Sequence, residues 1–208
     1  MHGTGLVNFM IKLVWIVMTE YYFDIETYSP NQRPDPRVDK IITIQFQKID
    51  LRTGKPKGEL EILKEWESSE KDIVSKFFYR FFNDKNVWEF VAVGYNLNFE
   101  WELLIAKFKK YFNKDYNSFD IHYKRPHIDI QHIVVLLNNG SFSGAKLDKF
   151  TGKPHDGSLI PKWYEEKKYN DIVTYIEKEA ESFLNLLQQI IIALNRFKNE
   201  RNRNLNFK

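Results

Sequence analysis

The stretch Phe23-Asp24-Ile25-Glu26-Thr27 places two carboxylates two residues apart inside an apolar and aromatic run. Aromatic and β-branched residues favour strands, so this stretch is predicted to be a β-strand. Side chains alternate between the faces of a strand, which puts Asp24 and Glu26 on one face, roughly 6.5–7 Å apart. Two such carboxylates repel one another and lose hydration unless a cation lies between them. The pair is typical of a site for a hard divalent metal ion, and the alternative is an edge strand whose acids face water.

A second acidic position follows another predicted strand. The apolar run 87–93 is expected to be a strand, and residues 101–112 have the pattern of a helix. Asn96 and Asn98 are alternative caps for that helix, and Glu100 then lies in its first turn. Glu100 is therefore expected close to the end of the preceding strand.

A third acidic position lies on the long helix predicted from about residue 170 to residue 199. Its apolar stripe, at i, i+3, i+4 and i+7 spacing, comprises Ile172, Tyr175, Ile176, Glu179, Phe183, Leu186, Leu187 and Ile190. Glu179 lies in the middle of this stripe, one turn after Tyr175 on the same face. A carboxylate on a buried helix face is unfavourable unless it is paired or bound to a metal ion.

In this order, the three places resemble motifs I, II and III of the DEDD superfamily of 3′-5′ exonucleases, which share a ribonuclease-H-like fold. Motif I of that family is Asp-x-Glu, as in 24–26. Motif II is Asn-x-x-Phe-Asp-x-x-x-Leu, which residues 96–104 match except that the acid is Glu100. Motif III of the tyrosine branch is Tyr-x-x-x-Asp, matched by 175–179 with glutamate again in place of aspartate. The resemblance covers about residues 18 to 190, and it extends to the exonuclease domains of family-B DNA polymerases.

This resemblance implies a divalent-metal-dependent 3′-5′ exonuclease that hydrolyses phosphodiester bonds at nucleic-acid 3′ ends. Two ions, Mg²⁺ or Mn²⁺, about 3.5–4 Å apart would supply the chemistry. Asp24 would bridge both ions, Glu26 and Glu179 would hold the ion that carries the nucleophile, and Glu100 would reach the other. Tyr175 would orient the attacking water. The residues expected to contact a single-stranded 3′ end, of DNA or RNA, are Thr27, Tyr28, Asn96, Asn98 and Phe99.

The two glutamates at positions of the family's aspartates leave the activity open. Glutamate is longer by one methylene, roughly 1.5 Å, and a positioning error of about 1 Å costs about a hundredfold in rate. Either the site is built for glutamate or it has departed from catalysis. The alternatives are therefore a weak or inactive exonuclease-like module that binds nucleic acid, and a structure-specific endonuclease on the same fold.

The remaining patterns predict an α/β fold. Lys40–Lys48 and Glu59–Trp66 are expected to be strands that form an antiparallel meander with the first, and Ile128–Ile130 a further short strand. Residues 69–82 are predicted to be a helix capped by Ser69. The sequence therefore predicts a ribonuclease-H-like mixed sheet, a three-strand antiparallel meander plus parallel strands, flanked by helices.

The composition fits one domain of ordinary size. The chain has 208 residues, of which 43% are hydrophobic and 16% aromatic, with a net charge of +3 and no cysteine. The lack of cysteine excludes disulfides, thiolate zinc sites and cysteine nucleophiles, and it suits a reducing cytoplasm, where we expect the protein. We expect an N-terminal extension at 1–17, the exonuclease domain at 18–199 and a basic tail at 200–208. The apolar run 5–18 contains Lys12 and is short, so no membrane span is expected; the oligomeric state stays open.

Several polar residues have two interpretations. Lys107, Lys109, Lys110, Lys114, Lys124 and Arg125 either guide a nucleic-acid backbone or form an ordinary solvated surface. Asp129 is expected to be a structural hydrogen-bond acceptor rather than a metal ligand. His127 and His132 are expected to be surface residues.

Overall fold

The computed structural model describes residues 18–29, 34–151 and 157–205. The predicted extension 1–17 and the last three residues of the predicted tail lie outside this range. Within it, one six-stranded sheet has the order β3-β2-β1-β5-β6, and β4 also pairs with β2. The strands are β1 (Glu20–Tyr28), β2 (Lys40–Asp50), β3 (Lys55–Pro56), β4 (Glu61–Lys64), β5 (Val91–Gly94) and β6 (His127–Asp129).

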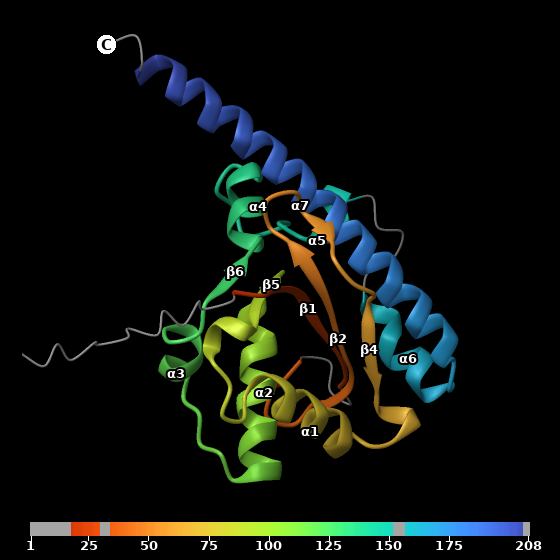
Figure 1. Ribbon diagram of the computed structural model, residues 1–208. Helices are drawn as coiled ribbons and strands as arrows, with labels where there is room; N and C mark the ends of the chain where they lie inside the picture. The colour runs from red at the N-terminus through yellow and green to blue at the C-terminus, as the bar shows by residue number, and fades with distance from the viewer. Residues whose placement is uncertain (1–17, 30–33, 152–156, 206–208) are drawn as a thin grey trace, which may run out of the picture.

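The sheet mixes the two kinds of pairing that were predicted. β1 pairs antiparallel with β2, and β2 pairs antiparallel with β4, which completes the meander. β5 then pairs parallel with β1, and β6 parallel with β5. The predicted mixed sheet, an antiparallel meander joined to parallel strands and flanked by helices, is confirmed (Figure 1).

Helices cover both faces of this sheet (Figure 1). They are α1 (Glu70–Phe81), α2 (Leu97–Phe112), α3 (Ser118–His122), α4 (Gln131–Leu137), α5 (Leu147–Thr151), α6 (Ile160–Glu165) and α7 (Tyr169–Leu205), with short 3₁₀ turns at Glu65–Glu67, Val87–Glu89 and Gly157–Leu159. None of the helices described combines the length and apolar character needed to cross a lipid bilayer.

Alternation along β1 divides its side chains between two cores. Phe23 and Ile25 pack with residues of α1 and α2 on one face. Tyr22 packs on the other face, against α7, where its ring lies 4.9 Å from that of Phe183. Asp24 and Glu26 share the face of Tyr22, so β1 presents both carboxylates to α7.

Local signals predicted some element boundaries correctly and others wrongly. Ser69 caps α1 by accepting from the backbone N–H of Asp72, as expected. The strand predicted at 87–93 is wrong in its first half, because Asn86 accepts from the N–H of Trp88 and starts a 3₁₀ turn. α7 runs to Leu205, so the part of the predicted tail that the structure describes continues the helix.

The third strand and the second helix also differ from the prediction. The third strand is β4, which is shorter than the 59–66 predicted, because the chain turns at Glu65–Glu67. α2 begins at Leu97, four residues before the predicted start at Trp101.

Two of the six basic residues considered as a nucleic-acid surface are buried. The ammonium of Lys107 lies 2.7 Å from the carboxylate of Glu70 and donates to the backbone carbonyl of Asp39. The guanidinium of Arg125 lies 3.7 Å from the centre of the Phe82 ring. Both stabilise the core around α1 and α2 rather than a binding surface, because a buried cation needs its local partners.

Candidate metal centre

Three carboxylates converge between β1 and α7. Each of Asp24, Glu26 and Glu179 offers an oxygen, and these oxygens all lie within 4.8 Å of one another. The strand period brings the first two to one face, and the buried stripe of α7 brings the third opposite them. A β-bulge follows Glu26, where the register with β2 shifts, and bulges of this kind change the direction of neighbouring side chains.

Tyr175 lies one helical turn before Glu179 and is buried. Burial raises the pKa of its phenol, and the negative charges of Glu26 and Glu179 raise it further, as does its hydrogen bond with Glu179. The phenol therefore keeps its proton across the physiological range. Tyr175 can donate a hydrogen bond in this site, but it cannot act as a base.

Glu100, in the first turn of α2, is only 5% exposed. Burial raises the pKa of its carboxyl well above the usual range, and the charge of Asp24 adds to this effect. Among the described residues, its Oε2 atom has no hydrogen-bond partner. A buried, unpartnered carboxyl oxygen beside other acids is a group that a cation would satisfy.

The donor set fits a hard divalent cation. Every candidate ligand in the group is a carboxylate oxygen, the ligand that Mg²⁺ and Mn²⁺ favour. Glu100 does not belong to the group of three whose oxygens lie within 4.8 Å of one another. The negative charges of Asp24 and Glu179 nevertheless raise the pKa of its carboxyl. The three converging carboxylates therefore fit one cation, and the buried carboxyl of Glu100, whose Oε2 atom has no partner among the described residues, is a further candidate ligand.

We expect Glu100→Gln to raise the free energy of unfolding of the metal-free protein at neutral pH. The raised pKa means that the folded protein holds a proton on Glu100 that the unfolded chain releases. Stability therefore falls as pH rises from the unfolded value, about 4.3, towards the folded one. Glutamine does not titrate, so the free energy of unfolding of the variant should not show this decrease with rising pH.

Urea unfolding in EDTA between about pH 4 and 8 measures the difference. Glu59→Gln, an exposed change away from the site, is the control and should leave the pH dependence of wild type unchanged. The same pH dependence in wild type and Glu100→Gln would contradict the role of burial.

Asp129 is a structural acceptor, as expected. Its two carboxylate oxygens accept from the backbone N–H groups of Asn96, at 3.0 Å, and Leu97, at 2.9 Å. Asp129 thus caps α2 from β6, which explains why the helix starts early and holds Glu100 in its first turn. Of the two predicted caps, Asn96 occupies the N-cap position of α2, but its backbone is left-handed, with φ of 59°, and its side chain makes no cap bond. Asn98 lies inside the helix.

The residues expected to contact nucleic acid do not all lie together. A pocket of about 340 Å³ is lined by Asn96 together with Tyr175 and Glu179. Thr27, Tyr28, Asn98 and Phe99 do not line it. Tyr28 instead donates to the carboxylate of Glu165 on α6, at 2.9 Å.

The sequence analysis missed the polar side chains that support this centre from β2. Thr43 and Gln45 are both fully buried, and Gln45 donates to Asp24. The signal was present, because two polar residues alternate within the apolar run 41–46.

No family model matches the chain. DNA polymerase 2 of Aeropyrum pernix is 37% identical over 86 residues, which is 41% of this chain and 10% of that protein. The family B DNA polymerase from Pyrobaculum calidifontis superposes with a TM-score of 0.60 at 18% identity, over 84% of this chain and 25% of that one. E. coli exonuclease I, solved with a dT13 oligonucleotide, superposes with a TM-score of 0.59 at 12% identity, over 88% of this chain and 43% of that one.

The chain thus spans a tenth of the curated relative and less than half of each of these solved chains. At these identities the solved structures show the fold alone, and they confirm the predicted ribonuclease-H-like α/β fold.

Proposed function

We propose that this chain is a divalent-metal-dependent 3′-5′ exonuclease that acts on single-stranded nucleic-acid ends. The observation that carries the proposal is the convergence of Asp24 and Glu26 from β1 with Glu179 from α7, within 4.8 Å. Tyr175 beside them and the buried Glu100 complete a constellation that suits phosphodiester hydrolysis. The dT13 oligonucleotide held by the structurally similar exonuclease I supports a single-stranded substrate.

Asp24, Glu26 and Glu179 would hold one Mg²⁺ or Mn²⁺ ion, and Asp24 with Glu100 a second. Bound there, the pair of ions would supply an activated water and neutralise charge on the departing 3′ oxygen. The four carboxylates balance much of the charge of two divalent cations, and the cations in turn would offset the repulsion between the carboxylates.

The other groups of the site position the reactants. Tyr175 stays protonated, and without metal its single O–H pairs with Glu179. With Glu179 holding a cation, this O–H would instead donate to the attacking water and orient it, without taking a proton from it. The pocket lined by Asn96, Tyr175 and Glu179 lies directly beside the carboxylates and would receive the terminal nucleotide. Thr27, Tyr28, Asn98 and Phe99, which lie outside this pocket, would contact only the nucleotides further from the end.

The site is proposed to be built for glutamate rather than to have lost its function. The side chain of Glu179 is long enough to bring its oxygen within 4.8 Å of those of Asp24 and Glu26. We therefore expect Glu179→Asp, which restores the residue of the family motif, to lower the rate by about a hundredfold, because it withdraws the carboxylate by about 1.5 Å.

Hydrolysis rates on a labelled oligonucleotide would measure this effect. Glu181→Asp, an exposed change on the same helix, is the matched control. A gain of activity in Glu179→Asp would instead mean that glutamate at this position impairs the site.

The proposed function is tested with 5′-labelled single-stranded DNA and RNA, incubated with Mg²⁺ or Mn²⁺. A ladder that shortens from the 3′ end, and disappears in EDTA, is expected, and the two substrates distinguish DNA from RNA. Cleavage of a circular single strand would indicate an endonuclease instead. Intact oligonucleotides under every metal, with binding that persists in EDTA, would overturn the proposal in favour of a binding module.

A further inference from the structure

Two fully buried polar side chains on β2 lie behind the carboxylates of β1. Gln45 is directly opposite Asp24 in the antiparallel register, and Thr43 is opposite Glu26. Both Thr43 and Gln45 are 0% exposed. Directly opposed residues of an antiparallel pair have side chains on the same face and in contact.

A chain of hydrogen bonds connects these residues to the site. The amide Nε2 of Gln45 donates to Oδ2 of Asp24 at 2.7 Å. The hydroxyl of Thr43 donates to Oε1 of Gln45 at 2.9 Å. A carboxylate can only accept, so the amide must turn its nitrogen towards Asp24 and its oxygen towards Thr43. Chemistry therefore allows only one orientation of this amide.

An amide suits this position better than a cationic donor would. The terminal torsion of an aspartate is broad and about two-fold, so the carboxylate needs a partner to hold its plane. Lysine or arginine would hold it but would also neutralise the charge that a divalent cation requires. The Gln45 amide is neutral, so it orients Asp24 and leaves the negative charge in place.

We propose that Gln45 is a positioning residue that sets the Asp24 carboxylate for cation binding, and that Thr43 holds the Gln45 amide in its working orientation. The inference rests on the proposed function, since it assigns Asp24 to a cation site. Burying two polar side chains in an apolar strand is unfavourable without such partners, and the chain of bonds ends on the residue that both cations would share.

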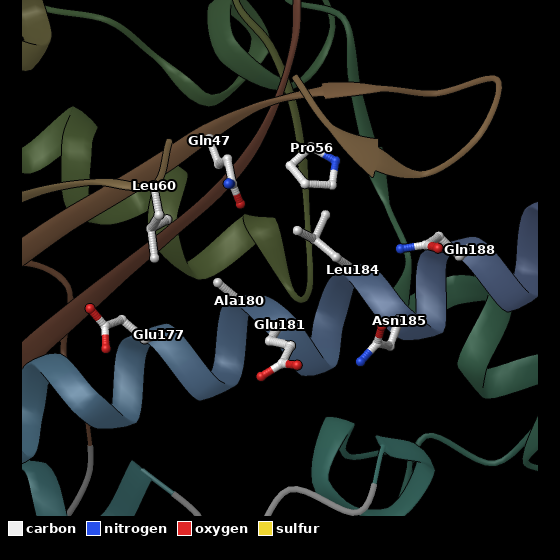
Figure 2. A pocket seen from close by; sticks show the side chains of 9 residues that line it. All are labelled: Gln47, Pro56, Leu60, Glu177, Ala180, Glu181, Leu184, Asn185 and Gln188. Carbon is white, nitrogen blue, oxygen red and sulfur yellow. The ribbon is translucent and has the colours of Figure 1, made fainter. Parts of the chain in front are cut away.

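The test compares Gln45→Met with Gln47→Met. Gln47 lies two residues along the same strand, donates to the carbonyl of Gly58 at 2.8 Å, and lines a separate pocket of about 380 Å³ beside Glu181 and Leu184 (Figure 2). Mn²⁺ binding to metal-stripped protein is measured by titration calorimetry, and kcat and KM on a labelled oligonucleotide are measured alongside. Methionine keeps the length of glutamine and removes the donor.

We expect Gln45→Met to bind Mn²⁺ about 10-fold to 100-fold more weakly, as is found when partners that orient metal ligands are removed. kcat at subsaturating Mn²⁺ should fall with it, while KM for the oligonucleotide stays unchanged. Gln47→Met should match wild type. Thr43→Val should weaken Mn²⁺ binding in the same direction, and Thr43→Ser, which keeps the hydroxyl, should restore it.

Wild-type Mn²⁺ affinity in a folded Gln45→Met protein would overturn the inference. Circular dichroism in EDTA establishes whether Gln45→Met folds. If it does not fold, the Mn²⁺ affinities of Thr43→Val and Thr43→Ser test the inference in its place. Equal affinity in Thr43→Val and Thr43→Ser would then overturn the inference, and rescue by serine alone would support it. A wild-type protein that neither binds Mn²⁺ nor shortens any oligonucleotide would overturn the proposed function itself, a result distinct from a failure confined to the Gln45 variant.

Discussion

Asp24→Asn is expected to abolish shortening of labelled oligonucleotides, with a fall of at least about a thousandfold in rate, because a bound divalent ion is worth several kcal/mol at the transition state. Asp24 converges with Glu26 and Glu179, and among the neighbouring carboxylates its charge contributes most to the raised pKa of Glu100. An amide in its place cannot balance the charge of two cations. Single-turnover rates at saturating Mn²⁺ measure the loss.

The same substitution should leave the fold intact. In metal-free protein the carboxylates repel one another, so replacing one with a neutral amide should keep or raise the thermal midpoint in EDTA. The stabilisation that Mn²⁺ gives to wild type by binding the folded state should disappear in the variant. Asp171→Asn, an exposed change in the first turn of α7, is the matched control. Near wild-type turnover in Asp24→Asn would contradict the assignment of this residue.

Tyr175→Phe is expected to lower kcat by about a hundredfold to a thousandfold, the usual effect of losing one positioned hydrogen-bond donor. The raised pKa keeps the Tyr175 hydroxyl protonated, so its contribution is a donated hydrogen bond. The aromatic ring remains in the variant and can keep its contact with Trp163, at 6.2 Å between ring centres. Mn²⁺ affinity should therefore stay close to that of wild type while turnover falls.

The contrast between metal affinity and turnover separates a positioning role from packing. Tyr169→Phe, at the start of the same helix and stacked on Trp66 at 4.6 Å between ring centres, should change neither quantity. Wild-type kcat in Tyr175→Phe would show that the hydroxyl has no part in the reaction. A loss of Mn²⁺ binding in that variant would show instead that Tyr175 acts through Glu179.

The elements that the sequence predicted well are those with local causes. The alternation of β1 and the Ser69 cap of α1 depend on residues within a few positions of one another. The first half of the strand predicted at 87–93 failed because a short apolar run is compatible with a turn as well as a strand. α2 started earlier than predicted because its cap, Asp129, comes from a strand about thirty residues later.

The candidate site shows the same division. The spacings of Asp24 with Glu26 and of Tyr175 with Glu179 were sufficient to predict two shared faces. The resemblance to the exonuclease motifs was needed to expect that these faces meet. The burial of Lys107 against Glu70 was not predicted, since a lysine on an amphipathic helix has the same local pattern whether it faces water or a buried acid.

The sequence by itself determined which side chains share a face, because the periods of strand and helix follow from backbone geometry alone. Tertiary structure alone decided which faces meet and at what distance. It brought Glu179 within 4.8 Å of Asp24 and Glu26, left a Glu100 oxygen without a partner among the described residues, and placed Gln45 behind Asp24. These contacts join residues far apart in the chain, and they exist only because the packing of α7 and β2 on β1 buries enough apolar surface to hold the acids together.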